Sequence, residues 1–122
     1  MSNTARNKQT VMKLFDALRA ADADAFDNLI AVDYVQHNPL AGNGLQAVKA
    51  FFTQLGPGEI DVHRIIADGD FVVAHSYFKP FNSAAIDIWR FNDEGKMIEH
   101  WDAIQQVPET TASGNDMFTQ LT

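Results

Sequence analysis

The sequence predicts an α+β domain in which helices come first and antiparallel strands follow. In the first half of the chain, apolar residues recur at spacings of three and four, the period of an amphipathic helix. In the second half, alternating runs are separated by turns rich in Asp, Asn and Gly, as in strands joined by hairpins. We therefore expect the helices to pack on one face of a β-meander.

Three helices are expected in the first half. A short helix over residues 25–31 follows Asp24, whose side chain can cap its N-terminus. A third helix covers residues 45–55 and is ended by Gly-Pro-Gly. Between them, the residues leading to Pro39 are expected to be extended, because proline restricts the residue before it. The first helix, over residues 4–21, carries an apolar stripe made of Val11, Leu14, Phe15, Leu18 and Ala21.

Four strands are expected in the second half. Turns at Asp68-Gly69-Asp70 and around Gly95 mark their ends. Residues 108–122 are rich in Thr, Ser and Gly and read as a C-terminal tail of one domain spanning residues 1–122. The expected strands cover residues 59–67, 71–78, 85–91 and 96–105.

Composition excludes several classes of function. With 46% apolar and 11% aromatic residues, 122 residues can form one sizeable core. The net charge is −7 and Lys and Arg are not clustered, which argues against nucleic acid and anionic membranes as partners. The absence of cysteine excludes disulfides, thiolate catalysis and cysteine-based zinc sites. A polar N-terminus and the lack of a long apolar run lead us to expect a cytoplasmic protein.

Asp87 interrupts a strand that otherwise reads as buried. Strand alternation places it on the same face as Ala85, Trp89 and Phe91. Burial disfavours the charged form of a carboxyl group, so such a residue needs a partner for its charge or a use for its proton. Two interpretations stay open: an acid–base group, or a structural carboxylate bonded to the backbone or to an arginine such as Arg64.

The Asp87 strand is apolar on both faces, because Ile86 and Ile88 alternate with the residues just named. Helices can cover one face. The other face also needs cover, and a homodimer through the outer face of the sheet would supply it.

The chain has four histidines, and none lies in an obvious solvent loop. Each alone reads as a half-buried structural residue, but with Asp87 on neighbouring strands a His–Asp pair would be a workable general acid–base device. Imidazoles and a carboxylate also suit zinc or iron, but local ligand spacings such as H-x-H or HExxH are absent, and we expect neither metal nor cofactor. The histidines are His37, His63, His75 and His100.

Five segments, in this order, resemble the SnoaL-like polyketide cyclase branch of the NTF2-like superfamily. The resemblance covers about residues 8–106. It implies a cone-shaped α+β barrel in which three N-terminal helices pack into a strongly curved antiparallel sheet, with a deep pocket and a dimer through the sheets. The segments are Tyr34-Val-Gln-His-Asn-Pro39, Val62-His-Arg64, Ala67-Asp-Gly-Asp70, Asp87-Ile-Trp-Arg90 and Gly95-Lys-Met-Ile-Glu-His-Trp-Asp102.

The resemblance also implies a site. Asp87 matches, through its Asp-Ile-x-Arg pattern, the aspartate that acts as acid–base in an intramolecular aldol condensation, and we expect His75 to assist it. This predicts a small cofactor-free acid–base enzyme, of aldol cyclase or isomerase type, acting on an apolar carbonyl compound. The alternatives are a non-catalytic module that binds a small ligand, and a dimerisation module. The residues expected to bind substrate are Tyr34, His37, His63, Trp89, His100 and Trp101.

The chain differs from those cyclases in one respect. The connection between His75 and the Asp87 strand is short, where the cyclases carry a longer loop that shapes the pocket for a multi-ring substrate. We therefore expect a smaller substrate than a polyketide.

Overall fold

The computed structural model describes residues 2–122. In these residues the α-helices lie in the first half and a four-strand meander follows, which confirms the α+β class, but an unpredicted strand, β1, lies between the helices. The elements are α1 (Asn3–Ala20), the 3-10 helix η1 (Ala23–Asn28), β1 (Ile30–Gln36), α2 (Leu45–Leu55), β2 (Ile60–Asp68), β3 (Phe71–Phe78), the 3-10 helix η2 (Lys79–Phe81), β4 (Ser83–Phe91) and β5 (Met97–Gln106).

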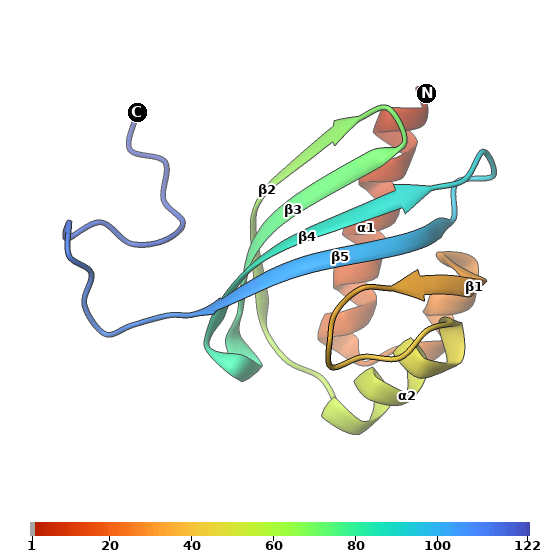
Figure 1. The fold of residues 1–122 in the computed structure, drawn as a ribbon, viewed down its shortest axis with the longest axis horizontal. Helices are drawn as coiled ribbons and strands as arrows, with labels where there is room; N and C mark the ends of the chain where they lie inside the picture. Colours follow the sequence, from red (N-terminus) through yellow and green to blue (C-terminus); the bar gives the residue numbers. More distant parts are fainter. Residues whose placement is uncertain (1) are drawn as a thin grey trace.

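The five strands form one curled sheet in the order β1-β5-β4-β3-β2. Strands β2 to β5 pair antiparallel with their neighbours, whereas β1 pairs parallel to β5 at the edge. Figure 1 shows α1 crossing one face of this sheet, with α2 close to β1. Two details of the prediction are therefore corrected: the sheet is mixed rather than antiparallel, and it is curled and open rather than a closed barrel.

Strand β1 is the strand that the sequence did not reveal. The helix expected over residues 25–31 ends early, since η1 stops at Asn28 and Ile30 already begins the strand. The strand pairs with β5 through Ile30 opposite Met97 and Gln36 opposite His100. This pairing joins segments more than sixty residues apart, so local periodicity carries no sign of it.

Helix α1 begins and ends at recognisable caps. The Ser2 hydroxyl accepts a hydrogen bond from the Ala5 backbone N–H at 3.2 Å, and Ala21 ends the helix in a left-handed conformation (φ 53°). The predicted apolar stripe faces the sheet, where Phe15 packs edge-on against Trp89 with ring centroids 5.9 Å apart. This contact joins the helix layer to the inner face of β4.

The two faces of β4 differ as alternation predicts. Ala85, Trp89 and Phe91 are buried on the inner face, whereas Ile86 on the outer face is 40% exposed. The inner face of the sheet and the two α-helices enclose the core. Among residues 2–122, no helix is long and apolar enough to span a membrane.

Residues 107–122 form no helix or strand, but they do contact the sheet. The Phe118 ring stacks on His63 at 4.7 Å and lies 5.3 Å from the His75 ring. The Phe118 carbonyl accepts a hydrogen bond from Arg64 Nη2 at 2.6 Å. The tail is thus anchored on the outer face, at the edge formed by β2 and β3.

Replacing Phe26 by alanine should destabilise the fold strongly. This side chain is fully buried and packs edge-on against Phe52, so its removal leaves a cavity in the core. We expect the free energy of unfolding to fall by about 3–5 kcal/mol. Urea denaturation followed by tryptophan fluorescence measures it. Met12→Ala, at a position of α1 that is 55% exposed, is the matched control and should cost less than about 1 kcal/mol; equal losses would contradict the assignment of the core.

Candidate functional site

A cavity of about 430 Å³ lies between the inner face of the sheet and the helices. Apolar side chains form most of its wall. Of these, Phe51 and Phe81 are about half exposed and Leu40 is almost fully exposed. Most of its polar lining comes from the last part of β1, the loop that follows β1, and the middle of β4 and β5. Those residues are Tyr34, Gln36, Asn38, Asp87, His100 and Asp102.

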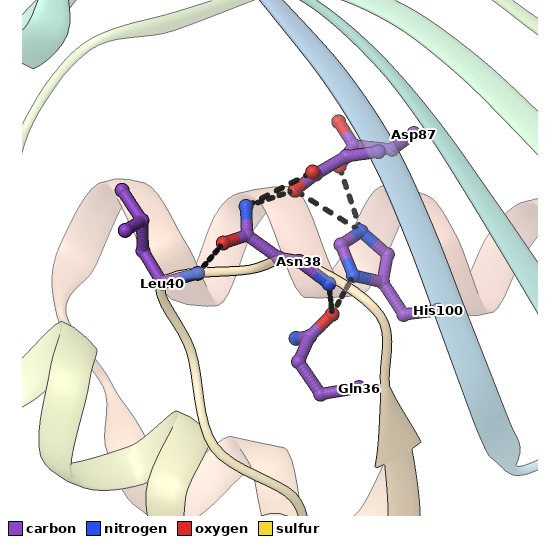
Figure 2. A network of polar contacts seen from close by, with 6 residues as sticks. Gln36, Asn38, Leu40, Asp87 and His100 are labelled. Carbon is purple, nitrogen blue, oxygen red and sulfur yellow. Dashed lines mark hydrogen bonds and ion pairs between the residues drawn. The ribbon is translucent and has the colours of Figure 1, made fainter.

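Asp87 and His100 form the centre of this polar group. His100 lies on β5 and Asp87 on β4, and His100 Nε2 is 2.8 Å from Asp87 Oδ1 (Figure 2). The two side chains are only 9% and 16% exposed. Asp102 is the direct cross-strand neighbour of Asp87 and, two residues after His100, shares its face. Its carboxylate lies 4.0 Å from His100 Nε2.

The segment that leaves β1 connects these groups into a network. His100 Nδ1 lies 2.7 Å from Gln36 Oε1, which also accepts a hydrogen bond from the Asn38 backbone N–H at 3.0 Å. The Asn38 side-chain amide donates to both oxygens of Asp102, at 2.9 and 2.8 Å. Its own oxygen accepts from the Leu40 backbone N–H at 2.8 Å, so every labelled residue in Figure 2 belongs to one connected set of contacts.

Burial among apolar side chains raises the pKa of Asp87 above its ordinary value of 3.8. The hydrogen bond and charge of His100 oppose this effect, and the nearby charge of Asp102 adds to it. Burial likewise raises the pKa of the Tyr34 hydroxyl, with a further contribution from Asp87. The site therefore favours the protonated, neutral forms of Asp87 and Tyr34.

Asp87, His100 and Asp102 are also a set of side chains that could approach one ion, since their ligand atoms lie within 4.8 Å of one another. Each is already engaged, however. Asn38 donates to both oxygens of Asp102, and both nitrogens of His100 have hydrogen-bond partners. An ion would have to replace these contacts, so the arrangement as it stands suits proton transfer better than metal binding.

Four of the residues expected at the site lie together in the cavity: Asp87, Tyr34, Trp89 and His100. The Tyr34 ring stacks on His100 with centroids 6.2 Å apart, and Trp89 lies 5.3 Å from the same imidazole. His100, expected only as a substrate-binding residue, therefore occupies the place of the Asp87 partner.

The expectation that His75 assists Asp87 needs correction. In the ladder between β3 and β4, His75 lies opposite Ile86 and Ala74 lies opposite Asp87, so His75 points to the outer face. There it contacts Arg64 and packs near Phe118. Arg64 is therefore also remote from Asp87, and the alternative of an Asp87–Arg64 structural pair does not describe this structure.

His63 lies on the same outer face as His75. It occupies an irregularity in the pairing of β2 with β3, between Val62 and Arg64, and is stacked on Phe118. Its ring is 6.2 Å from that of His75. The expected role of His63 in substrate binding would require a ligand on this face rather than in the cavity.

His37 and Trp101 form a separate pair, also outside the cavity. Their rings are parallel within 3° and 4.9 Å apart. His37 Nε2 lies 2.7 Å from a Glu99 carboxylate oxygen, and Glu99 also pairs with Arg90. The contacts lower the pKa of Glu99, first through His37 and then through Arg90. The arrangement links the end of β1 to the outer face of the sheet.

Sequence reasoning missed Gln36, Asn38 and Asp102. All three lie inside segments that the resemblance singled out, Tyr34–Pro39 and Gly95–Asp102. The available signal for Asp102 was its alternation with His100, which puts the two on one face of a strand. No comparable signal existed for Gln36 and Asn38, because their position depends on the parallel pairing of β1.

The raised pKa of Asp87 predicts a pH-dependent contribution to stability. Because the folded protein holds this proton more tightly than the unfolded chain, the stabilisation is fully present below pH 3.8 and is lost as the pH rises through the raised pKa. Asp87→Asn removes the ionisation and keeps a side chain that can hydrogen-bond to His100. We expect its Tm advantage over the wild type to grow from about pH 4 to about pH 8.

Thermal melts across that range measure the effect, with exposed Asp68→Asn as the matched control. The control should follow the wild type at every pH. A Tm difference for Asp87→Asn that does not vary with pH would contradict the raised pKa.

Several solved structures share this fold. They include an NTF2-like protein from Burkholderia xenovorans LB400 (TM-score 0.77, 16% identity, 97% of each chain covered). An LEH-like epoxide hydrolase from M. tuberculosis gives a TM-score of 0.69 at 20% identity, with 85% of this chain and 86% of that chain covered. A steroid delta-isomerase from Pseudomonas aeruginosa gives 0.63 at 21%, with 90% and 83% covered.

At these identities the structures establish the fold alone. Among curated proteins, none matches the sequence. The SnoaL-like domain family, however, matches residues 11–100, which include β1, α2, the Asp87 strand and His100. The match covers well over half of the chain, and the protein therefore belongs to the SnoaL-like domain family.

Proposed function

We propose that the protein is a general acid–base enzyme that moves a proton on a small apolar carbonyl compound. The observation that carries the proposal is the buried Asp87–His100 contact of 2.8 Å at the wall of an apolar cavity. A buried carboxyl group that faces a pocket and has an imidazole as its partner is typical of an acid–base site. The cavity, at about 430 Å³, suits a ligand of modest size.

The arrangement supports a simple sequence of proton transfers. Asp87 as a carboxylate takes a proton from a carbon next to the carbonyl group, and the electron pair of that C–H bond moves into the enolate. The resulting carboxylic acid then gives the proton to another carbon of the enolate, as in an isomerisation, or to an alkoxide formed when the enolate carbon attacks a second carbonyl. His100 stabilises the carboxylate form of Asp87, and the apolar wall excludes water.

The relatives are consistent with this proposal. The structures that share the fold include a steroid delta-isomerase and an epoxide hydrolase, by the names they carry. A binding module with the same fold remains the alternative function, because the pocket alone would also hold a ligand. What favours catalysis is that a carboxyl group and an imidazole lie in hydrogen-bond contact inside that pocket.

Asp87→Asn should abolish turnover while the fold persists. The amide cannot accept the substrate proton, so we expect kcat to fall by about 10²- to 10⁴-fold. The assay screens small ketones and enones for exchange of the hydrogen next to the carbonyl with deuterium, followed by NMR. Exposed Asp68→Asn is the matched control and should keep the wild-type rate. Full activity in Asp87→Asn would overturn the proposal, and binding without exchange by the wild type would favour the binding module.

The same assay separates the two candidate histidines. From the geometry we expect His100→Asn to lose most activity and His75→Asn to keep it, since only His100 contacts Asp87. The opposite result would restore the expectation drawn from the sequence, that His75 is the partner.

We also propose that two copies associate through the outer face of the sheet. Exposed apolar side chains on this face include Ile66 at 59%, Phe71 at 42% and Ile86 at 40%. Exposed apolar groups gathered on one face are typical of a contact between proteins. The residues lie on β2, β3 and β4, on the side of the sheet away from α1.

Sedimentation at micromolar concentration should therefore show a dimer. Ile86→Lys should shift the protein to monomer, because it would bury a charge in the contact. Met12→Lys, at an exposed position of α1, is the control and should remain dimeric. A monomeric wild type would rule out the association.

A further inference from the structure

We infer that Gln36 is a positioning residue that keeps a proton on Nδ1 of His100, so that Nε2 and the Asp87 carboxyl group share one further proton. The catalytic meaning of this arrangement rests on the proposed function. The arrangement itself follows from hydrogen-bond directions and can be measured without a substrate.

The first step is the orientation of the Gln36 amide. The oxygen and nitrogen of such an amide are distinguished by the partners they meet. A backbone N–H can only donate, and that of Asn38 points at the Gln36 side-chain atom 3.0 Å away. This atom must therefore be the oxygen, because an NH₂ group there would set donor against donor.

The second step is the tautomer of His100. The same Gln36 oxygen lies 2.7 Å from His100 Nδ1, and an oxygen of this kind only accepts hydrogen bonds. His100 Nδ1 must therefore carry a hydrogen. A bare Nδ1 would place two lone pairs against each other in a site where the His100 side chain is only 9% exposed.

The third step concerns the other ring nitrogen. With hydrogen on Nδ1, a neutral His100 has a bare Nε2, which lies 2.8 Å from Asp87 Oδ1. A hydrogen bond across this contact needs a proton on one side or the other. The pair is then either neutral imidazole with a carboxylic acid or imidazolium with a carboxylate, and it holds the same number of protons in both forms.

Without Gln36 the pair would have a third choice. A neutral imidazole could carry its hydrogen on Nε2 and donate a hydrogen bond to an ionised Asp87. Its Nδ1 would then carry no hydrogen. Gln36 thus removes the arrangement in which Asp87 is an ordinary carboxylate beside a neutral histidine. Burial, which raises the pKa of Asp87, acts in the same direction.

Asn38 keeps the second carboxylate, that of Asp102, from replacing Asp87 as the partner of His100 Nε2. Its amide oxygen accepts from the Leu40 backbone N–H, which turns its NH₂ group toward Asp102. Asp102 is thereby occupied as an acceptor and remains 4.0 Å from His100 Nε2. The other titratable group facing the imidazole is Tyr34 from β1, and the cavity walls that α1 and α2 contribute are apolar.

Nitrogen-15 NMR of ligand-free protein with labelled histidine tests the inference. His100→Asn identifies the His100 signals among those of the four imidazoles. We expect the wild-type Nδ1 signal to show a bonded hydrogen at neutral pH, and Gln36→Met to populate the form with a bare Nδ1. Gln36→Glu keeps a hydrogen-bond acceptor at the same place and should show the wild-type signals, with a hydrogen on Nδ1. Exposed Gln46→Met is the matched control and should leave the pattern unchanged.

A bare Nδ1 in the wild type would overturn the inference. This test needs only the wild type, so it can be made even if Gln36→Met proves too unstable to study. An unchanged pattern in well-folded Gln36→Met would overturn it as well. Where a substrate is known, Gln36→Met should lower kcat by about 10- to 100-fold, the range expected for one hydrogen bond to a charged group, with Gln36→Glu retaining activity. A locked tautomer without any turnover would refute the proposed function alone. A free tautomer with turnover that depends on Asp87 would refute only the role of Gln36.

Discussion

The burial of one carboxyl group, that of Asp87, is the constraint on which the rest of the site depends. Asp87 takes the place of an apolar residue on the inner face of β4, between Ala85 and Trp89. A carboxyl group in such surroundings is stable only with a partner that can exchange a proton or a charge with it. His100 is that partner, and His100 is in turn held by Gln36. Each member of the network is a hydrogen-bond partner of the one before it.

The network ends on the main chain, which explains why it can be rigid. The amide of Gln36 is fixed by the backbone of Asn38, and the amide of Asn38 by the backbone of Leu40. Side chains that are oriented by backbone groups lose little freedom when a ligand binds. The end of β1 and the loop that follows it therefore support the Asp87–His100 pair.

The sheet keeps two sets of polar residues apart. The inner set, around Asp87 and His100, lines an apolar cavity. The outer set includes His63 and His75, which lie under Phe118 of the tail. Since successive residues of a strand point to opposite faces, a sheet can carry both sets on the same strands without contact between them. The proposed acid–base chemistry and the proposed association therefore fall on opposite faces of the sheet, and the residues of each face decide its function.

Much of the architecture was predictable from the sequence, because it depends on local patterns. The period of three to four residues predicted α1 and α2, and turn residues predicted the four strands of the meander to within two residues or so. Alternation alone placed Asp87 on the inner face. The choice of its histidine depended instead on the register between strands, since a shift of one residue in the pairing of β3 with β4 would reverse the face of His75. Strand β1, Gln36 and Asn38 were decided only by the tertiary structure, because a parallel pairing between distant segments leaves no mark on the local sequence.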